Sequence, residues 1–375
     1  MNKGMTKREM MIKAFNNESV PEILFSPKLE LWYYYHNKMG TLPEEFKGNT
    51  LREIENKLGL VSPTWKGKVF EKSFSKNIEV RIEETKKTLT HIYETPYGEL
   101  SETYAFLDYL ERKPHVFKER LWKKPEDYKA LEYLIENTVF TPDYEAFKEY
   151  DKWVGEDGVP FANLEYYDPF YELIRNYIGF ELAYLELKYN RRQFLSLFNI
   201  FKQKYSELQD IALKSPADFI FHGAHYDNKM TPPHIFKEYI SPYLSDFATR
   251  LHERNKKIAI HLDADVSLLL EEIAATSVDI AESFTTYPLV DVKLEKAMEV
   301  WKNKITIWGG IPSSVFIPEN YSESEFIDYI NGVLQLLKEY DYKGLILGIG
   351  DNFMPQADIN RIRIIMKMIG NHKSC

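Results

Sequence analysis

From about residue 155 onward, the chain alternates short apolar runs with longer segments of helical periodicity. The longer segments, such as 234–255 and 266–276, space their apolar residues three and four positions apart, as an amphipathic helix does. Parallel strands need a helix-length connection, so repeated strand–helix units build a parallel sheet. The predicted strands are 158–164, 218–222, 257–262, 278–282, 304–309 and 343–348. This pattern indicates a (β/α)₈ barrel or a doubly wound sheet.

A doubly wound sheet that binds nucleotides usually carries a glycine-rich phosphate loop. The sequence contains neither Gly-x-Gly-x-x-Gly after an early strand nor a Walker A motif. We therefore predict an α/β fold, a single (β/α)₈ barrel, and a chain of 375 residues can form such a barrel as one domain over 1–375.

The N-terminal part of the sequence predicts a helical extension and an antiparallel insertion. Thr6 and Glu9 have the spacing of a capping box, which indicates an opening helix. The proline-bounded run 22–27 suits the first barrel strand. Over 67–106, β-branched and aromatic residues alternate with charged ones, as in antiparallel strands, and 125–150 has a helical pattern.

Composition and charge exclude several classes of partner. The formal net charge is −9, and Lys and Arg form no cluster, so a nucleic-acid partner is not expected. No run of about 18 apolar residues could span a membrane, and the N-terminus lacks a signal-peptide core, so we expect a cytoplasmic protein. The single cysteine, Cys375, cannot form an internal disulfide, so any metal is expected on His, Asp or Glu.

Ligand-type side chains follow the ends of successive predicted strands. In a barrel these ends meet at one mouth, where active sites of this fold are built. The residues are His222, His225, His261, Asp263, Glu282 and Asp351. Singly, a strand-end histidine is commonly structural, and Asp263 could cap the segment after it. Jointly they predict a functional mouth, and His261 with Glu282 and either His222 or His225 would give the three N/O ligands of a catalytic zinc site.

The same residues carry a resemblance to the uroporphyrinogen decarboxylase superfamily, and within it to cobalamin-dependent methyltransferases that demethylate methoxylated substrates. It covers roughly residues 5–370. The segments that carry it are 95–100, 232–236 with 241–243, 261–263, 279–285, 308–312 and 348–355.

Two departures from the superfamily's patterns narrow what the resemblance implies. The decarboxylases carry an arginine-rich N-terminal motif, whereas the matching region 25–32 has no arginine, which disfavours porphyrinogen decarboxylation. The thiol-activating methyltransferases hold zinc through His-x-Cys and a later Cys, but here Asp263 and Asp351 stand in those regions. What remains is an enzyme that moves a methyl group from a methoxylated, aromatic substrate to the Co(I) corrinoid of a separate corrinoid protein.

The resemblance also implies roles for individual residues. His261, Glu282 and His222 would hold zinc, Asp263 or Asp351 would orient a ligand or donate a proton, and His225 is a further catalytic candidate. Four aromatic residues would form the substrate wall, namely Trp32, Tyr33, Tyr34 and Tyr226. A homodimer is expected by analogy alone.

Two other classes of function stay open. One is a metal-dependent decarboxylase or lyase that acts on a small acid without a partner protein, or a porphyrinogen decarboxylase-like enzyme. The other is a non-catalytic barrel that binds a small molecule, whose binding would survive loss of His261 and Glu282 together.

Overall fold

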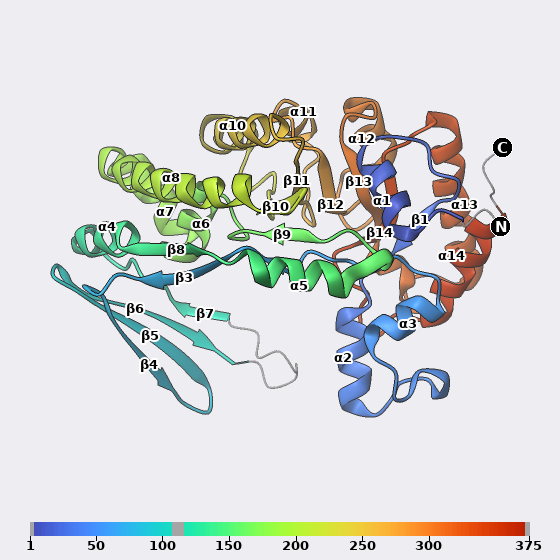
Figure 1. The fold of residues 1–375 in the computed structure, drawn as a ribbon, viewed down its shortest axis with the longest axis horizontal. Coiled ribbons are helices and arrows are strands. Elements are labelled where there is room, and N and C mark those ends of the chain that lie inside the picture. Colours follow the sequence, from blue (N-terminus) through green and yellow to red (C-terminus); the bar gives the residue numbers. More distant parts are fainter. Residues whose placement is uncertain (1–3, 107–115, 372–375) are drawn as a thin grey trace. The chain divides into compact units, whose positions relative to one another are not determined.

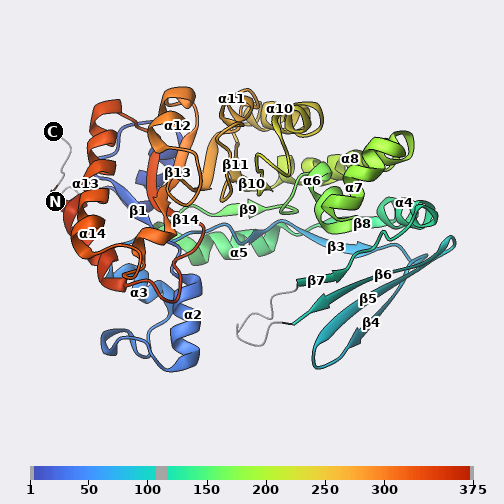
Figure 2. The ribbon, with the colours of Figure 1, turned by 180° about the vertical axis from the view of Figure 1, so that it is seen from behind.

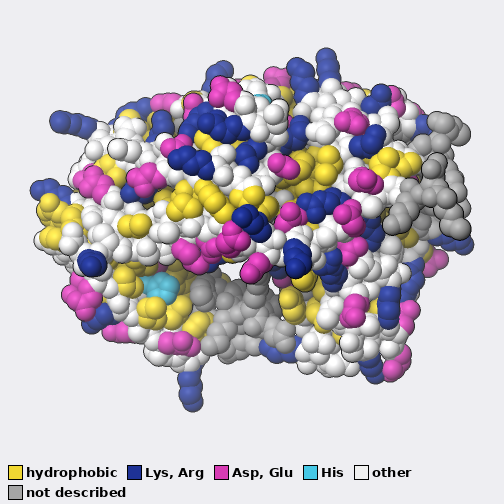
Figure 3. All heavy atoms as spheres, in the orientation of Figure 1, with side chains coloured by type: hydrophobic (Ala, Val, Ile, Leu, Met, Phe, Trp, Pro, Cys, Tyr) yellow, Lys and Arg dark blue, Asp and Glu magenta, His cyan; other side chains and the backbone are white. Residues whose placement is uncertain are grey.

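The computed structural model describes residues 4–106 and 116–371, so Cys375 lies outside the described residues. The chain forms two compact units (Figure 1). The larger unit draws on the ranges 1–67, 147–166 and 217–375, and the smaller on 68–146 and 167–216. None of the described helices is long and apolar enough to cross a membrane. On the face drawn in Figure 3, acidic and basic side chains of the described residues are interspersed.

The larger unit is organised around an eight-stranded sheet. Its strands, in spatial order, are β1 (Leu24–Ser26), β14 (Leu345–Gly350), β13 (Thr306–Pro312), β12 (Ile280–Phe284), β11 (Lys257–His261), β10 (Phe219–Ala224), β9 (Phe161–Asn163) and β2 (Gly67–Lys68). From β1 to β9 each neighbouring pair is parallel. The sheet and its surrounding helices confirm the predicted α/β fold class, and all six predicted C-terminal strands are present.

The segment 61–64 lies between β1 and β9. The backbone N–H of Val61 donates to the Phe25 carbonyl at 3.0 Å, and that of Phe161 donates to the Thr64 carbonyl at 2.8 Å. This is the place that the second strand of a (β/α)₈ barrel takes, between the first and the third. One buried cluster receives an apolar side chain from each of the eight segments: Leu24, Val61, Phe161, Phe219, Ala259, Ile280, Trp308 and Ile346.

The first helix, α1 (Lys7–Phe15), closes the amino-terminal end of this core. Thr6 and Glu9 form the predicted capping box. Phe15 packs its ring against Phe161 at 5.4 Å and Trp308 at 5.8 Å. Thr306, the first residue of β13, donates its hydroxyl to the Ala14 carbonyl at 3.0 Å. The amino ends of the strands are therefore covered, and the carboxyl ends form the opposite, polar side.

Amphipathic helices follow the strands. They are α10 (Ser241–His252), α11 (Leu270–Ala274), α12 (Leu294–Trp301), α13 (Glu323–Tyr340) and α14 (Ile359–Asn371), with α2 (Glu30–Met39) and α3 (Leu51–Lys57) nearer the N-terminus. Helix α13 starts at a capping box of Ser322 and Glu325 and buries Phe326, Ile330 and Val333 on one face. In Figures 1 and 2, α13 and α14 lie on the outside of β1 and β14.

The smaller unit contains the predicted antiparallel insertion. Strands β4 (Glu79–Glu84), β5 (Thr88–Thr95), β6 (Gly98–Ala105) and β7 (Val116–Glu119) form one antiparallel sheet, and β3 (Phe70–Phe74) pairs with β8 (Thr138–Pro142) in another. Its main helices are α4 (Tyr128–Glu136), α7 (Phe180–Tyr189) and α8 (Arg191–Lys214), while α5 (Tyr144–Val154) runs from this unit's range into that of the larger one. The two helices expected within 125–150 are α4 and α5, and strand β8, which was not expected, lies between them and pairs with β3.

Candidate active site

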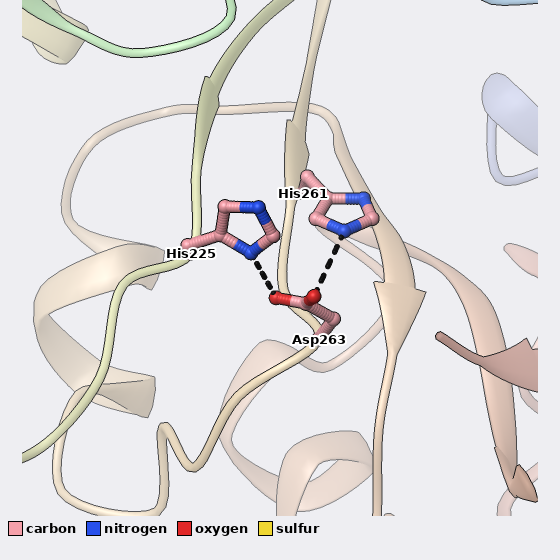
Figure 4. Close-up of side chains that lie close together, drawn as sticks. All are labelled: His225, His261 and Asp263. Atoms are coloured by element: carbon pink, nitrogen blue, oxygen red, sulfur yellow. Dashed lines mark hydrogen bonds and ion pairs between the residues drawn. The ribbon is translucent and has the colours of Figure 1, made fainter. Parts of the chain in front are cut away.

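Three ligand-type side chains converge beyond the carboxyl ends of β10 and β11 (Figure 4). His225 follows β10, His261 ends β11, and Asp263 lies two residues further on. Asp263 Oδ1 is 2.5 Å from His225 Nδ1, and Asp263 Oδ2 is 3.3 Å from His261 Nε2. Within the described ranges, this is the one group of three whose potential ligand atoms all lie within 4.8 Å of each other. We call it the His–His–Asp group.

The backbone of β10 is shaped to present His225. Gly223 has φ +100°, and a Cβ there would lie 2.6 Å from the Tyr226 hydroxyl oxygen, so only glycine fits. His225 itself is left-handed at φ 58°. Its backbone N–H donates to the His261 carbonyl at 3.0 Å, which holds the two histidines side by side. A non-glycine residue in this conformation is strained by about 1–3 kcal/mol, and such strain clusters at functional sites.

A buried ion pair lies behind His261. Glu282 Oε2 is 2.5 Å from His261 Nδ1, and Glu282 Oε1 is 2.5 Å from Lys28 Nζ. The side chains of Glu282 and Lys28 are 1% and 5% exposed, whereas those of Asp263 and His225 are 16% and 22% exposed. Close polar contacts therefore run from buried Lys28, after β1, to the partly exposed His225, after β10.

These contacts set the charge of each group. Burial alone would raise the pKa of Asp263, but the hydrogen bonds and charges of His225 and His261 outweigh it and hold that pKa far below its usual range. Burial likewise opposes ionisation of Glu282, yet the Lys28 and His261 charges lower its pKa. Burial disfavours a charged His261, but the Glu282 carboxylate prevails and raises the pKa of the imidazole. Both carboxyl groups are therefore ionised at neutral pH.

Aromatic rings flank the group. The Tyr166 ring lies 5.3 Å from the His225 ring and 5.6 Å from the His261 ring, and it stacks on Phe221 at 5.9 Å. Trp65 lies 6.5 Å from Phe221, and Lys28 Nζ lies 4.8 Å over the Trp65 ring. Lys28, Trp65 and Tyr166 were not among the site residues predicted from the sequence. Each of them follows one of the first three barrel strands. The search for polar or aromatic residues just after strand ends, which covered the C-terminal strands, would have found them there as well.

The structure does not bring His222 to the His–His–Asp group. Successive side chains of a strand point to opposite faces. Phe221 belongs to the barrel core, so His222 points outward, where its Nδ1 lies 2.6 Å from the Glu165 carbonyl oxygen and its Nε2 lies 3.0 Å from the Tyr243 hydroxyl. Complete burial lowers the pKa of His222 to about 4, so it is neutral. Glu282 was also predicted to bind the metal with His261. It contacts Nδ1 of the His261 ring, whereas Nε2 of that ring faces Asp263.

Asp351 and the predicted aromatic wall lie at other positions. The Asp351 backbone N–H donates to the Ser283 hydroxyl at 2.8 Å and so ties the end of β14 to that of β12. Trp32 is buried in α2 and packs on Phe46 and Phe353, while Tyr33 donates its hydroxyl to the Asn49 carbonyl and Tyr34 is exposed. Tyr226 is fully buried, with its ring edge-on to Phe236. Their roles in substrate binding stay predictions.

The fold and the position of the group are those of an α/β protein with a parallel sheet, surrounding helices and a candidate site at the carboxyl ends of the strands, an arrangement consistent with a (β/α)₈ barrel. The family model of uroporphyrinogen decarboxylase (URO-D) matches residues 180–372, a little over half of the sequence. The chain belongs to the uroporphyrinogen decarboxylase family. The matched range contains the whole His–His–Asp group and Glu282.

A solved structure shares the fold over nearly the whole chain. It is a methyltransferase from Methanosarcina mazei, 12% identical in sequence, with a TM-score of 0.58, and the match covers 98% of this chain and 99% of that one. At this identity the likeness concerns the fold alone. No curated protein matches the sequence significantly.

Proposed function

We propose that the chain is a methyltransferase that moves the methyl group of a methoxylated aromatic substrate to the Co(I) corrinoid of a separate protein. Membership of the uroporphyrinogen decarboxylase family and a fold shared with a methyltransferase support this proposal. The observation that carries it is the convergence of two imidazoles and one carboxylate at one mouth, beside the ring of Tyr166.

The donor atoms of the His–His–Asp group fit a zinc ion. Two imidazole nitrogens and a carboxylate oxygen, with room for a fourth ligand, are a common catalytic zinc set. His261 also has a carboxylate on its other ring nitrogen, as zinc-binding histidines commonly do. We therefore propose His225, His261 and Asp263 as the ligands, with Glu282 as an orienting residue, in place of the set His222, His261 and Glu282 inferred from sequence.

In the proposed reaction the methyl carbon leaves the ether oxygen for cobalt, so negative charge develops on that oxygen. Bound zinc would supply Lewis-acid chemistry at this oxygen. Asp263 is ionised and therefore serves better as a ligand than as a proton donor. The Tyr166 and Trp65 rings offer faces on which an aromatic substrate could pack. Asp351 stays a candidate for protonating the leaving oxygen.

Metal analysis and a methyl-transfer assay test the proposal. Purified protein should contain about one zinc per chain, and His261→Ala and Asp263→Ala should lose it. With a methoxylated aromatic compound and a reduced corrinoid protein, the parent should consume the Co(I) absorbance and both variants should not. His252→Ala is the matched control, because His252 also pairs with a carboxylate, that of Asp279, but near the start of β12. It should keep both the metal and the activity.

The same assay separates the other classes of function. A decarboxylase or lyase would turn over a small acid with no corrinoid protein present. A non-catalytic barrel would bind its ligand equally well after His261 and Glu282 are both replaced. Either result would contradict the proposal.

A further inference from the structure

Lys28 and Glu282 form an ion pair that is almost completely buried, with a 2.5 Å separation of Nζ and Oε1. Taking two charges out of water costs several kcal/mol for each, which their attraction recovers only in favourable geometry. A buried ion pair is thus weak evidence for stability, and another use for it has to be considered. The pair lies directly behind the His–His–Asp group, outside the proposed ligand set.

Lys28 is held in place from several sides. It follows β1 with φ 51°, in the left-handed region that a lysine seldom adopts. Its carbonyl accepts the backbone N–H of Phe353 at 3.3 Å, which ties it to the segment after β14. Its ammonium lies 4.8 Å over the ring of Trp65. Contacts therefore hold both the backbone and the ammonium of Lys28, and the side chain loses rotamer entropy as a result.

Glu282 passes this constraint on to His261. One carboxylate oxygen contacts Lys28 Nζ and the other contacts His261 Nδ1, so the carboxylate cannot rotate without breaking one contact. An imidazole that donates from Nδ1 to Glu282 turns Nε2 the other way, and here Nε2 faces Asp263 at 3.3 Å. The nitrogen that can bind a metal is thereby chosen by the contact on the opposite side of the ring.

We propose that Lys28 is a positioning residue for the metal site. Through Glu282 it fixes the rotation of the His261 ring, so that Nε2 points into the His–His–Asp group. Without the ammonium, Glu282 would lose the contact that fixes one of its two oxygens, and its carboxylate could rotate away from Nδ1. The inference rests on the proposed function for the metal, but the ring orientation is a property of the metal-free protein.

The test compares Lys28→Met with a double variant. Lys28→Met removes the charge and keeps an unbranched side chain beside Trp65. Loss of a second-sphere contact typically weakens metal binding about 10- to 100-fold, and we expect that loss for Co(II), measured by competition with a coloured chelator. The double variant Lys28→Met/Glu282→Gln carries no buried charge, yet its amide oxygen can still accept from Nδ1. It should recover most of the Co(II) affinity, which mere loss of packing would not allow.

Lys257→Met is the matched control, since Lys257 pairs with Asp279 at 3.2 Å at the start of β11. It should bind Co(II) as the parent does. If Lys28→Met fails to fold, Lys28→Leu, which also removes both the charge and the donor for Glu282, takes its place.

A second readout uses nitrogen-15 NMR of the histidine rings in the metal-free protein. The His261 signals of the parent should report a hydrogen-bonded Nδ1 that Lys28→Met loses and the double variant restores. Unchanged His261 signals together with unchanged Co(II) affinity in Lys28→Met would overturn the inference and leave the metal site standing. If the parent binds no Co(II), the metal part of the proposed function fails, and the ring signals alone then decide whether Lys28 positions His261.

Discussion

Among single residues, Gly223 shapes the backbone from which His225 is presented. An added Cβ would meet the Tyr226 hydroxyl at 2.6 Å and Ile260 at 3.2 Å, on a backbone with φ +100°. We expect Gly223→Ala to lower the free energy of unfolding by about 2–4 kcal/mol and to reduce zinc content, because His225 must shift. Urea denaturation and metal analysis measure the two effects. Gly332→Ala, in α13 with open space around the new methyl, should instead stabilise the protein by roughly 0.5–1 kcal/mol.

Glu55 makes stability depend on pH. Burial raises its pKa from 4.5 to about 7, against the hydrogen bond from Ser62. Because the folded pKa exceeds the unfolded one, its contribution is most favourable below pH 4.5 and declines by about 3 kcal/mol as the pH rises to about 7. Glu55→Gln should therefore unfold at higher urea than the parent at pH 8 and show no such gain at pH 4.5.

Glu53→Gln provides the comparison for Glu55, two residues away. Glu53 is exposed, and its hydrogen bonds with Thr50 at the start of α3 lower its pKa. The pKa shift of Glu53 is therefore opposite in sign to that of Glu55. Glu53→Gln should gain no stability at pH 8. A gain of equal size in both variants would show that the effect comes from net charge and not from burial of Glu55.

His222 in β10 and His225 just after it show what sequence could tell about the site. The rule that side chains after strand ends meet at one mouth named His225, His261, Asp263 and Glu282, and the structure has contacts that link these four side chains. It could not separate His222 from His225, because that depends on which face each side chain takes after the register shift between Phe221 and Ala224. The glycine at 223 was the hint, since glycine within a strand often marks such an irregularity.

Helix α1 has only nine residues, but it packs against three strands of the barrel. Its last residue, Phe15, contacts the rings of Phe161, Phe219 and Trp308 from three strands. We expect Phe15→Ala to cost about 3–5 kcal/mol, measured by urea denaturation, with Phe15→Leu costing distinctly less because it leaves a smaller cavity. Equal effects of the two variants would mean that the cavity is not the cause.

Regular elements were the easiest to predict and irregular ones the hardest. The capping box of Thr6 and Glu9 is a local pattern, and the structure has it. The segment 61–64 escaped prediction because Pro63 cannot donate to a ladder and the run is very short. Strand β8 depends on pairing with β3, about 68 residues earlier from centre to centre (Lys72 pairs with Phe140), and such non-local pairing leaves little trace in a local pattern.

For the whole molecule, the alternation of strands and helices was sufficient to predict the fold class, because parallel connectivity leaves few arrangements. The division into two compact units was not apparent in the same way. The alternating pattern that begins at 67 marks the boundary near 68, but no change of composition marks those near 146, 167 and 216, which arise from packing that the sequence pattern does not display.

Metal binding should stabilise the molecule as a whole. A ligand that binds the folded state alone adds about 2.7 kcal/mol at one hundred times its dissociation constant. We therefore expect zinc to raise the thermal midpoint of the metal-free protein by several degrees, a shift absent in His261→Ala and retained in His252→Ala. A shift of the same size in His261→Ala would place the stabilising ion elsewhere.

The ring of Trp65 gives the site an optical reporter of its own. It lies under the Lys28 ammonium at 4.8 Å and 6.4 Å from Trp308. A positive charge so near an indole alters the energy of its excited state, and a second indole beside it can exchange excitation with it. Any event that moves Lys28 therefore changes the colour or intensity of the emission, and subtracting the spectrum of Trp65→Phe isolates that signal without a label.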